Sequence, residues 1–168
     1  GTGILVTTSG FSIGGAGASN YTLTQPTTTA DITARSLTVT ADDRSKVYGQ
    51  TVTFAGTEFT SSGLVGGQTI GSVTLTSSGA AATATVAGSP YAIVASNATG
   101  GTFNPSNYSI SYVDGSLTVT PATLTISGVT ANNKVYDATT AATLNTGSAA
   151  LVGILNGDTV TLNSGIAV

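Results

Sequence analysis

The sequence predicts an all-β protein made of tandem small antiparallel β domains, of the β-sandwich or β-grasp-like type, with about 85 residues per repeat. Three observations predict it: β-branched residues are abundant, apolar and hydroxyl residues alternate, and one ordered set of motifs occurs more than once. Thr accounts for 33 of the 168 residues and Ser for 19, while 40% of the chain is hydrophobic. β-Branched residues favour an extended backbone. The net charge of only −3, combined with this hydrophobic content, argues against disorder.

The strands are recognised by side chains that alternate between apolar and polar with a period of two. Residues 37–41, 91–96 and 109–113 show this alternation, which is typical of half-buried strands. Only residues 61–67 have a composition that also allows a single helical turn, and no long helix is expected. The core residues that we expect in the middle of the chain are Leu37, Val39, Tyr48, Phe54, Val73, Ile93, Tyr108 and Leu117.

Turn residues separate these strands. The pairs Gly66-Gly67, Asp114-Gly115 and Asn156-Gly157 signal short hairpins, because the central positions of such turns favour a positive φ. Residues 88–90 and 104–106 contain proline and are expected to form wider loops. Short strands joined by such turns predict an antiparallel arrangement.

Four motifs occur twice, in the same order and at nearly the same spacing. The pairs are residues 36–40 with 123–127, 46–49 with 134–137, 20–23 with 107–110, and 67–70 with 157–160, at spacings of 87, 88, 87 and 90 residues. Chance matches in a Thr-rich chain would not keep a common spacing. The chain therefore contains an internal repeat, which is the signature of a tandem array.

The order of the motifs predicts where the repeats begin and end. Residues 35–120 contain the whole series once, residues 121–168 contain its first half, and residues 1–34 contain its second half. Joining the end of the chain to its beginning would restore a second unit of 82 residues. We expect the chain to be a window onto a longer array, with 121–168 of one copy meeting 1–34 of the next, head to tail. Pairing of both ends within one chain is the alternative.

The composition excludes several classes of function. Without His or Cys, the chain has no thiol nucleophile, disulfide, Cys or His metal site, or Ser-His-Asp triad. Four basic residues cannot neutralise a run of phosphates, so no nucleic acid is expected as a partner. No run of 18 apolar residues and no signal-peptide pattern occurs, so we expect no membrane insertion. We predict that the protein is not an enzyme and has no catalytic residue, cofactor or metal site.

The Lys-Val-Tyr motif is the most distinctive feature of each repeat. Tyr48 and Tyr136 are interpreted as rings that cover the end of a small core and bond a backbone group, with ligand contact as the alternative. Gly49 is expected to supply a positive φ to the turn that follows.

Two further hypotheses concern the acidic residues. Calcium binding remains open, although the aspartates are scattered and no Asp-x-Asp-x-Asp loop occurs. A Lys–Asn cross-link is the second hypothesis, with Lys46 or Lys134 as the amine and Glu58 or Asp137 as the assisting acid. A lysine whose stem lies along a strand edge is the simpler interpretation.

The motifs resemble a known pair of domain families. "LTVTADDRSKVYGQTVTF" followed by "NYSISYVDGSLTVTPA" resembles the MBG domain of the YGX type. "TLTISGVTANNKVYDATTAATL" with "NGDTVTL" behind it resembles the YDG domain, and "GASNYTLTQPTTTADITA" resembles the end of a YDG unit. The resemblance makes 1–34 the C-terminal half of a YDG-like repeat, 35–120 a complete MBG-like repeat, and 121–168 the N-terminal half of the next YDG-like repeat. The structural signature residues that transfer are Lys46, Tyr48, Gly49, Lys134, Tyr136 and Asp137.

The resemblance also implies a setting and a role. Both domains occur in large secreted bacterial surface adhesins of the filamentous-haemagglutinin type, so it implies an extracellular, cell-surface location and no enzymatic activity. The leading hypothesis is a structural repeat that forms the stalk or shaft of a long extracellular fibre, with neighbouring copies, other fibres and surface glycans as partners. The alternative is an adhesive module that itself binds a glycan or a protein.

Overall fold

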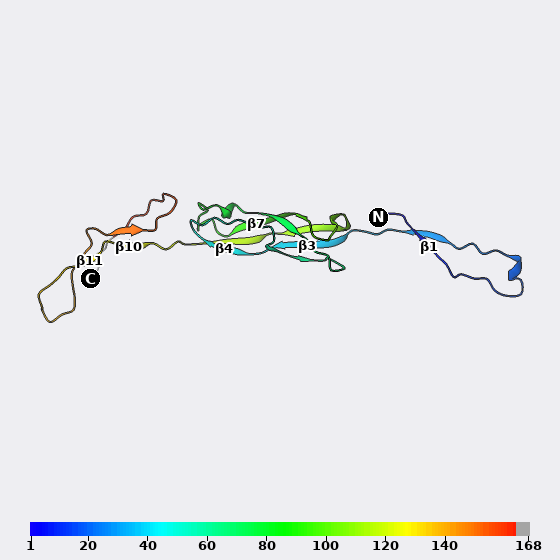
Figure 1. The fold of residues 1–168 in the computed structure, drawn as a ribbon, viewed down its shortest axis with the longest axis horizontal. Helices are drawn as coiled ribbons and strands as arrows, with labels where there is room; N and C mark the ends of the chain where they lie inside the picture. The colour runs from blue at the N-terminus through cyan, green and yellow to red at the C-terminus, as the bar shows by residue number, and fades with distance from the viewer. Residues whose placement is uncertain (164–168) are drawn as a thin grey trace.

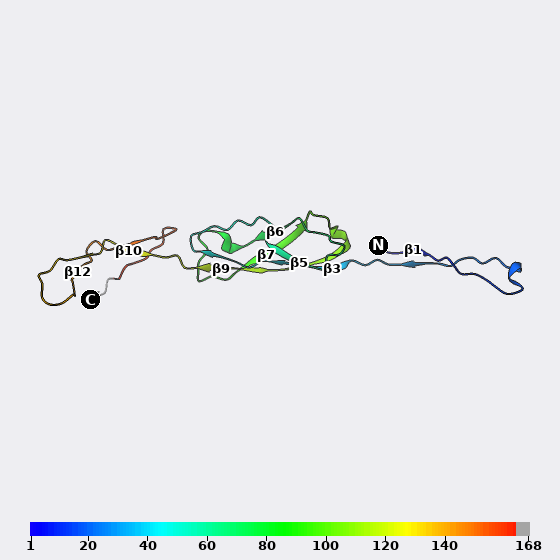
Figure 2. The same ribbon diagram turned by 60° about the horizontal axis from the view of Figure 1, so that its bottom comes forward.

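The computed structural model describes residues 1–163 of the protein. Three parts follow one another along one long axis: an N-terminal part of residues 1–34, a middle domain of residues 35–120, and a C-terminal part of residues 121–163 (Figure 1). Figure 2 shows the same succession from another side. Every α-helix-like element in these residues is a single 3₁₀ turn, and none is long or apolar enough to cross a membrane. The predicted all-β class is confirmed.

The strands fall into five small sheets. The middle domain holds β3 (Arg35–Ala41), β4 (Arg44–Val47), β5 (Phe59–Ser62), β6 (Ser72–Thr76), β7 (Tyr91–Thr99), β8 (Tyr108–Val113) and β9 (Gly115–Thr120), with the 3₁₀ turns η2 (Ser78–Ala80) and η3 (Pro105–Asn107). Their orders are β5-β3-β8 and β4-β9-β7-β6. The N-terminal part holds β1 (Ile4–Thr7), η1 (Ala18–Asn20) and β2 (Thr27–Ala30). The C-terminal part holds β10 (Thr125–Ser127), β11 (Thr130–Ala131), β12 (Leu144–Asn145) and β13 (Ala150–Val152), paired as β10-β13 and β11-β12.

The first and last strands of the middle domain run parallel, which corrects the expectation of a purely antiparallel domain. β3 pairs with β8 and β4 pairs with β9, and every pair joins residues that are 73 positions apart. The two segments therefore form one long parallel pair that bends once and passes from one sheet to the other. Alternation of side chains reports burial of one face, but it does not report the direction of the neighbouring strand.

The bend depends on Gly115, the first residue of β9, and the Asp114-Gly115 pair lies between β8 and β9, which belong to different sheets, rather than in the predicted hairpin. A Cβ at this position would lie 2.7 Å from the Ala41 carbonyl oxygen and 2.8 Å from that of Asp42. Asp43 fills the gap in the ladder, because its Oδ1 accepts a hydrogen bond of 2.7 Å from the Ser116 N–H. Glycine is required here by the close approach of two backbones.

A single hydrophobic core lies between the two sheets of the middle domain. Leu37, Val39, Ile93 and Leu117 have 0% exposure, and all four belong to the expected core. Of the expected core, Val73 and Tyr108 are also buried, Phe54 is partly buried, and Tyr48 is not in the core. The buried apolar residues that the expected core did not include are Ala41, Leu75, Ala95, Ala98, Phe103 and Val119.

The terminal parts repeat the strand pairing of the middle domain in the same register. Ile4 pairs with Ala30 as Tyr91 pairs with Leu117, after a shift of 87 residues, and η1 matches η3 at the same shift. In the C-terminal part, β10 and β13 pair as β3 and β5 do. Three pairs correspond there: Thr125–Val152 with Thr38–Ser62, Ile126–Leu151 with Val39–Ser61, and Ser127–Ala150 with Thr40–Thr60. In contrast to the middle domain, none of residues 1–34 or 121–163 is buried.

The turns of the two repeats also correspond. Gly66 and Gly67 have φ values of 62° and 69°, and Asn156 and Gly157 have values of 55° and 73°. In the first turn, the Gln68 N–H donates a hydrogen bond to the Val65 carbonyl. In the second turn, the Asp158 N–H donates one to the Leu155 carbonyl. Both pairs thus form turns with positive φ at both central residues. Residues 61–67 contain the end of β5 and this turn, and the helical alternative is wrong.

Candidate functional site

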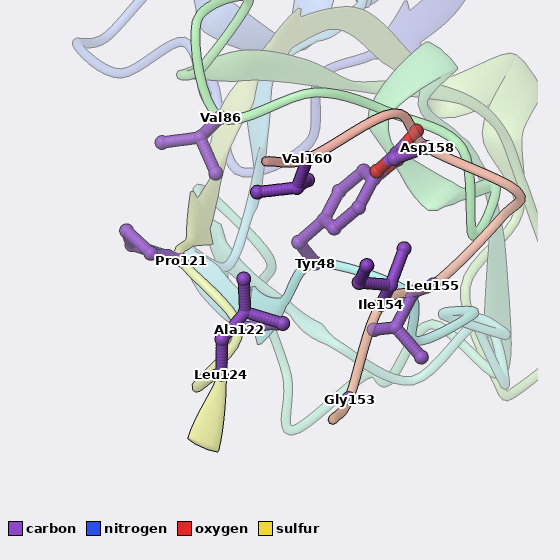
Figure 3. Close-up of a pocket in the computed structure, with 10 residues that line it drawn as sticks. All are labelled: Tyr48, Val86, Pro121, Ala122, Leu124, Gly153, Ile154, Leu155, Asp158 and Val160. Carbon is purple, nitrogen blue, oxygen red and sulfur yellow. The ribbon is translucent and has the colours of Figure 1, made fainter. Parts of the chain in front are cut away.

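The candidate site is an apolar pocket at the joint between the middle domain and the C-terminal part. Its volume is about 210 Å³. Figure 3 shows the Tyr48 ring at its centre, with side chains of both parts around it. The lining residues are Tyr48 and Val86 of the middle domain, Pro121, Ala122 and Leu124 of the connection, and Gly153, Ile154, Leu155, Asp158 and Val160 of the C-terminal part. The joint is therefore built by residues far apart in the sequence.

The end of β4 sets the position of the Tyr48 ring. The Tyr48 N–H donates a hydrogen bond of 2.8 Å to the Thr120 carbonyl, which holds the tyrosine beside the last residue of β9. The ring is half-buried and faces the turn of residues 154–160. Its position differs from the sequence interpretation, because the ring covers the joint between two units rather than the core of one. Among residues 1–163, no hydrogen bond of the hydroxyl was found.

Gly49 has the positive φ that the sequence predicted, with a value of 89°. Its N–H donates a hydrogen bond of 3.2 Å to the Ala82 carbonyl. The side chain of Leu155 packs on Gly49 and occupies the space that a Cβ would need. Gly49 is thus suited to this position both by its backbone conformation and by the close approach of the C-terminal part.

One polar contact accompanies this apolar packing. The Asn156 side chain donates a hydrogen bond of 3.1 Å from its Nδ2 to the Ala82 carbonyl oxygen. The same oxygen accepts a hydrogen bond from the Gly49 N–H. The Ala82 carbonyl therefore links Gly49 of the middle domain to Asn156 in the turn of the next unit. An apolar pocket with one directional hydrogen bond can fix the orientation of two units.

Lys46 is buried, with 5% exposure, and ties the joint to the middle domain. Its Nζ donates hydrogen bonds to the Gln50 carbonyl, at 2.9 Å, and to the Ala81 carbonyl. A buried ammonium group is costly unless its hydrogen bonds are satisfied, and these two carbonyls provide partners. The contacts of Lys46 are thus structural, and neither an asparagine nor Glu58 is among them.

Glu58 is engaged elsewhere, at the turn before β5. Its carboxylate forms an ion pair of 2.8 Å with Arg44 and accepts hydrogen bonds from the N–H groups of Ala55, Gly56 and Thr57. The backbone hydrogen bond from Ala55, followed by the other N–H groups of this turn, holds the pKa of Glu58 below its ordinary value. Partial burial opposes this lowering. Glu58 is therefore an ionised structural residue and is not placed to assist a cross-link of Lys46.

The second signature, in the C-terminal part, forms a local cluster. The Lys134 Nζ lies 2.7 Å from Asp137 Oδ1 and 2.6 Å from the Thr139 hydroxyl. Hydrogen bonding to Lys134, and then to Thr139, lowers the pKa of Asp137. Tyr136, between them, is 87% exposed. The structure thus brings Tyr48 and Gly49 into the joint with Lys46 beneath, and leaves Tyr136 without a comparable surface.

Sequence analysis did not single out residues 153–155 or the segment of Ala82 and Val86 as part of a site. A signal existed in the matched glycines Gly63 and Gly153, which lie just before the two equivalent turns. For metals, residues 1–163 contain no group of three acidic side chains that could hold an ion.

The fold and the joint define a class: an all-β chain of tandem small domains, in which the middle domain and the following part meet end to end through Tyr48 and the turn of residues 154–160. Residues 37–118 match the MBG domain (YGX type), and residues 120–168 match the YDG domain. Two such domains in succession indicate a repeat or adhesin-like module. Comparison with curated proteins and with solved structures found no match.

Proposed function

We propose that the protein is a structural repeat unit of an extracellular fibre at a bacterial cell surface, and that copies join head to tail to form its stalk or shaft. It is not an enzyme in this proposal and uses no cofactor. Its role is to convert small domains into length and to hold an adhesive end away from the cell. Adhesion, cell–cell contact or matrix assembly is then the function of the whole fibre.

The observation that carries the proposal is the register match between the terminal parts and the two halves of the middle domain. Residues 1–34 keep the β7–β9 pairing, and residues 121–163 keep the β3–β5 pairing. Each part lacks the strands that the other has. Figure 1 shows them at opposite ends of the middle domain, which supports completion of each part by a neighbouring copy rather than by the other end of the same chain.

The exposed apolar residues of the terminal parts support this pairing. Leu124 is 37% exposed and is the counterpart of Leu37, which is fully buried. Tyr21 is 75% exposed and is the counterpart of Tyr108, which is 7% exposed. Each residue has the type that a core requires, and completing the domain would bury both. Heterologous contacts of this kind propagate into filaments unless the rotation closes a ring.

The middle domain supplies the register of the missing contact. Its parallel pair places the Thr38 and Ser111 hydroxyls 3.3 Å apart. The counterparts at a shift of 87 residues are Thr125 in one copy and Thr24 in the next. Neighbouring strands lie about 4.8 Å apart, within the Cα range of about 4.4–6.8 Å that a disulfide needs. Because the chain contains no Cys, engineered pairs report this contact without background.

The test is oxidation of the double variant Thr24→Cys/Thr125→Cys, followed by a non-reducing gel. We expect a ladder of covalent multimers. Thr38→Cys/Ser111→Cys is the matched control and should close within one chain, giving a cross-linked monomer. Thr24→Cys/Ile126→Cys places the second thiol on the opposite face and should give much less ladder. A Thr24→Cys/Thr125→Cys protein that stays monomeric at high concentration contradicts the proposal.

The exposed rings of Tyr21 and Tyr136, at 75% and 87% exposure, are also the feature that a sugar-binding platform would use. A glycan array separates the two functions. Saturable binding that is lost in Tyr21→Ala and Tyr136→Ala would favour a binding module. Absence of binding together with a covalent ladder favours the fibre.

A further inference from the structure

The turn that docks on Tyr48 has a counterpart on the middle domain itself. Residues 64–70 match residues 154–160 at a shift of 90, and both form turns with positive φ at the two central residues. Both follow a glycine whose backbone approaches the start of the first strand of its unit, Gly63 against Ser36 and Gly153 against Thr123. Each unit therefore carries the same turn at the end where the preceding unit joins it.

The tyrosine that receives the turn is repeated as well. Tyr136 and Asp137 are the counterparts of Tyr48 and Gly49 at a shift of 88 residues. In the observed joint, Tyr48 lies among residues of the following turn, whereas Tyr136 is 87% exposed. In the turn of residues 64–70, Leu64 and Ile70 pack on the core of their own domain, whereas Val65 is 44% exposed. Among residues 1–163, the Tyr136 ring and the exposed side of this turn around Val65 thus offer surface for a second joint.

We propose that Tyr136 of one copy packs on the turn of residues 64–70 of the next copy, forming a second joint that repeats the first. This inference rests on the proposed head-to-tail assembly and adds the contact that sets the angle between the completed YDG unit and the following MBG domain. The occupant is a second copy of this chain, because only the repeat supplies a matching turn.

The sizes of the facing residues support this pairing. In the observed joint, the residue after the tyrosine is Gly49, and it faces the large side chain of Leu155. In the proposed joint, the residue after the tyrosine is Asp137, and the counterpart of Leu155 is the smaller Val65. A larger residue on one side is thus matched by a smaller residue on the other, while the Asp137 carboxylate keeps its bonds to Lys134 and Thr139.

The chain connection also supports it. In the observed joint, the Tyr48 N–H bonds the Thr120 carbonyl, just before the next unit begins at Pro121. The counterpart of Thr120 is Thr33, just before β3. Arg35, at the first position of β3, donates a hydrogen bond of 2.9 Å to the Gly63 carbonyl and so holds the turn beside this connection. The second surface is therefore continuous with the end of the N-terminal part.

The experiment uses photo-cross-linking in fibres that are locked by the Thr24→Cys/Thr125→Cys disulfide. The photoreactive residue p-benzoyl-phenylalanine replaces Tyr136, and mass spectrometry of a mixture of isotopically heavy and light chains identifies the cross-linked peptides. We expect mixed heavy–light cross-links between position 136 and residues 64–70. The same residue at position 48 is the matched control and should mark residues 154–160 of its own chain.

The outcomes separate this inference from the proposed function. A covalent ladder with cross-links from position 136 to other residues, or within its own chain, overturns the second joint and leaves the fibre intact. Absence of the ladder overturns the fibre and the second joint together. As a second measurement, Tyr136→Ala should shorten the persistence length of the fibres in micrographs without reducing the ladder. An unchanged persistence length would count against the joint.

Discussion

The middle domain and the terminal parts have the same local pairing but opposite burial. Leu37 in β3 and its counterpart Leu124, directly before β10, differ in burial: the first is fully buried and the second is 37% exposed. The same contrast separates Tyr108, at 7% exposure, from Tyr21, at 75%. Short segments of this protein therefore pair in the same register on their own, whereas a buried core forms only where the complete set of strands is present.

The physical reason is the parallel pair that closes the middle domain. β3 and β8 join residues 73 positions apart, and this contact brings the two short-range pairings together into one core. The β3–β5 and β7–β9 pairings join residues that are closer in the sequence, such as Thr38 with Ser62 and Tyr91 with Leu117, and side-chain alternation sets their register. Closing a long loop costs entropy, which is recovered only when both halves bury their apolar faces. A terminal part has only one half and cannot do so alone.

The largest effect is expected from truncating the same leucine in the two regions. Leu37→Ala should lower the free energy of unfolding of the middle domain by about 2–5 kcal/mol, because it leaves a cavity in a closed core. Leu124→Ala should change it by less than about 0.5 kcal/mol, since its side chain is partly exposed and outside that core. Chemical denaturation of the full chain, followed by tyrosine fluorescence, measures both.

In fibres locked by the Thr24→Cys/Thr125→Cys disulfide, Leu124→Ala should have a larger effect than it has in the monomer. If Leu124 becomes a core residue on assembly, Leu124→Ala should destabilise the fibre toward denaturant, while the monomer stays unaffected. Equal and small effects of both substitutions in the monomer would contradict the burial contrast.

A smaller effect is expected from the matched glycines before the docking turns. Gly63 has a φ of 116°, and a Cβ there would overlap the Ser36 carbonyl. Gly63→Ala should therefore destabilise the middle domain by about 1–3 kcal/mol. Gly153 has a φ of 103° and a Cβ would lie 3.0 Å from the Thr123 carbonyl, but no core depends on it. Gly153→Ala should leave the unfolding transition unchanged, and a comparable shift would show that the C-terminal part folds cooperatively with the middle domain.

Sequence patterns predicted the pieces of this fold better than their assembly. Alternation identified Leu37, Val39 and Ile93 because it reports one buried face of a strand. It did not reveal the parallel pairing, because parallel and antiparallel neighbours give the same alternation. It also did not identify Phe103, which lies in a loop between strands and enters the core from outside any alternating run.

The sequence motif identified residues of the candidate site, but the structure places the Tyr48 ring elsewhere than the sequence interpretation did. The Lys-Val-Tyr repeat singled out Tyr48, and its neighbour Gly49 has the expected positive φ. The ring was expected over its own core, because a single unit offers no other surface. The joint depends on a second unit, and only the correspondence between residues 64–70 and 154–160 carries that information in the sequence.

The acidic turn of the middle domain should give a pH-dependent effect of about 1 kcal/mol. The folded state lowers the pKa of Glu58 from its ordinary value of 4.5. Its contribution to stability is therefore present above that value and is lost as the pH falls through the lowered pKa. Glu58→Gln should be less stable than the parent protein at pH 7, and the difference should shrink below pH 4.5.

The control for charge alone is Asp114→Asn, which removes a carboxylate on an exposed residue of the same domain. Denaturation series at several pH values compare the three proteins. A stability difference between Glu58→Gln and the parent that stays constant with pH would show that the backbone hydrogen bonds do not depend on the charge of Glu58.

The smallest effect on stability is expected for the lysine of the C-terminal signature, Lys134, whose contact is local. Its counterpart Lys46 makes its contacts beside the core of the middle domain. Lys134 bonds Asp137 at 2.7 Å within a cluster whose carboxylate is largely exposed, and this bond is the main cause that lowers the pKa of Asp137 from its ordinary value of 3.8. Lys134→Ala should therefore raise the pKa of Asp137 in an NMR titration without moving the unfolding transition, since exposed ion pairs contribute little to stability. Lys46 is the counterpart with 5% exposure, and Lys46→Ala leaves the Gln50 and Ala81 carbonyls without their donor, so it should lower the melting temperature measurably. If Lys134→Ala instead moves the unfolding transition and Lys46→Ala does not, the cluster at residue 134 takes part in a folded unit already in the single chain, and the contrast between the two regions fails.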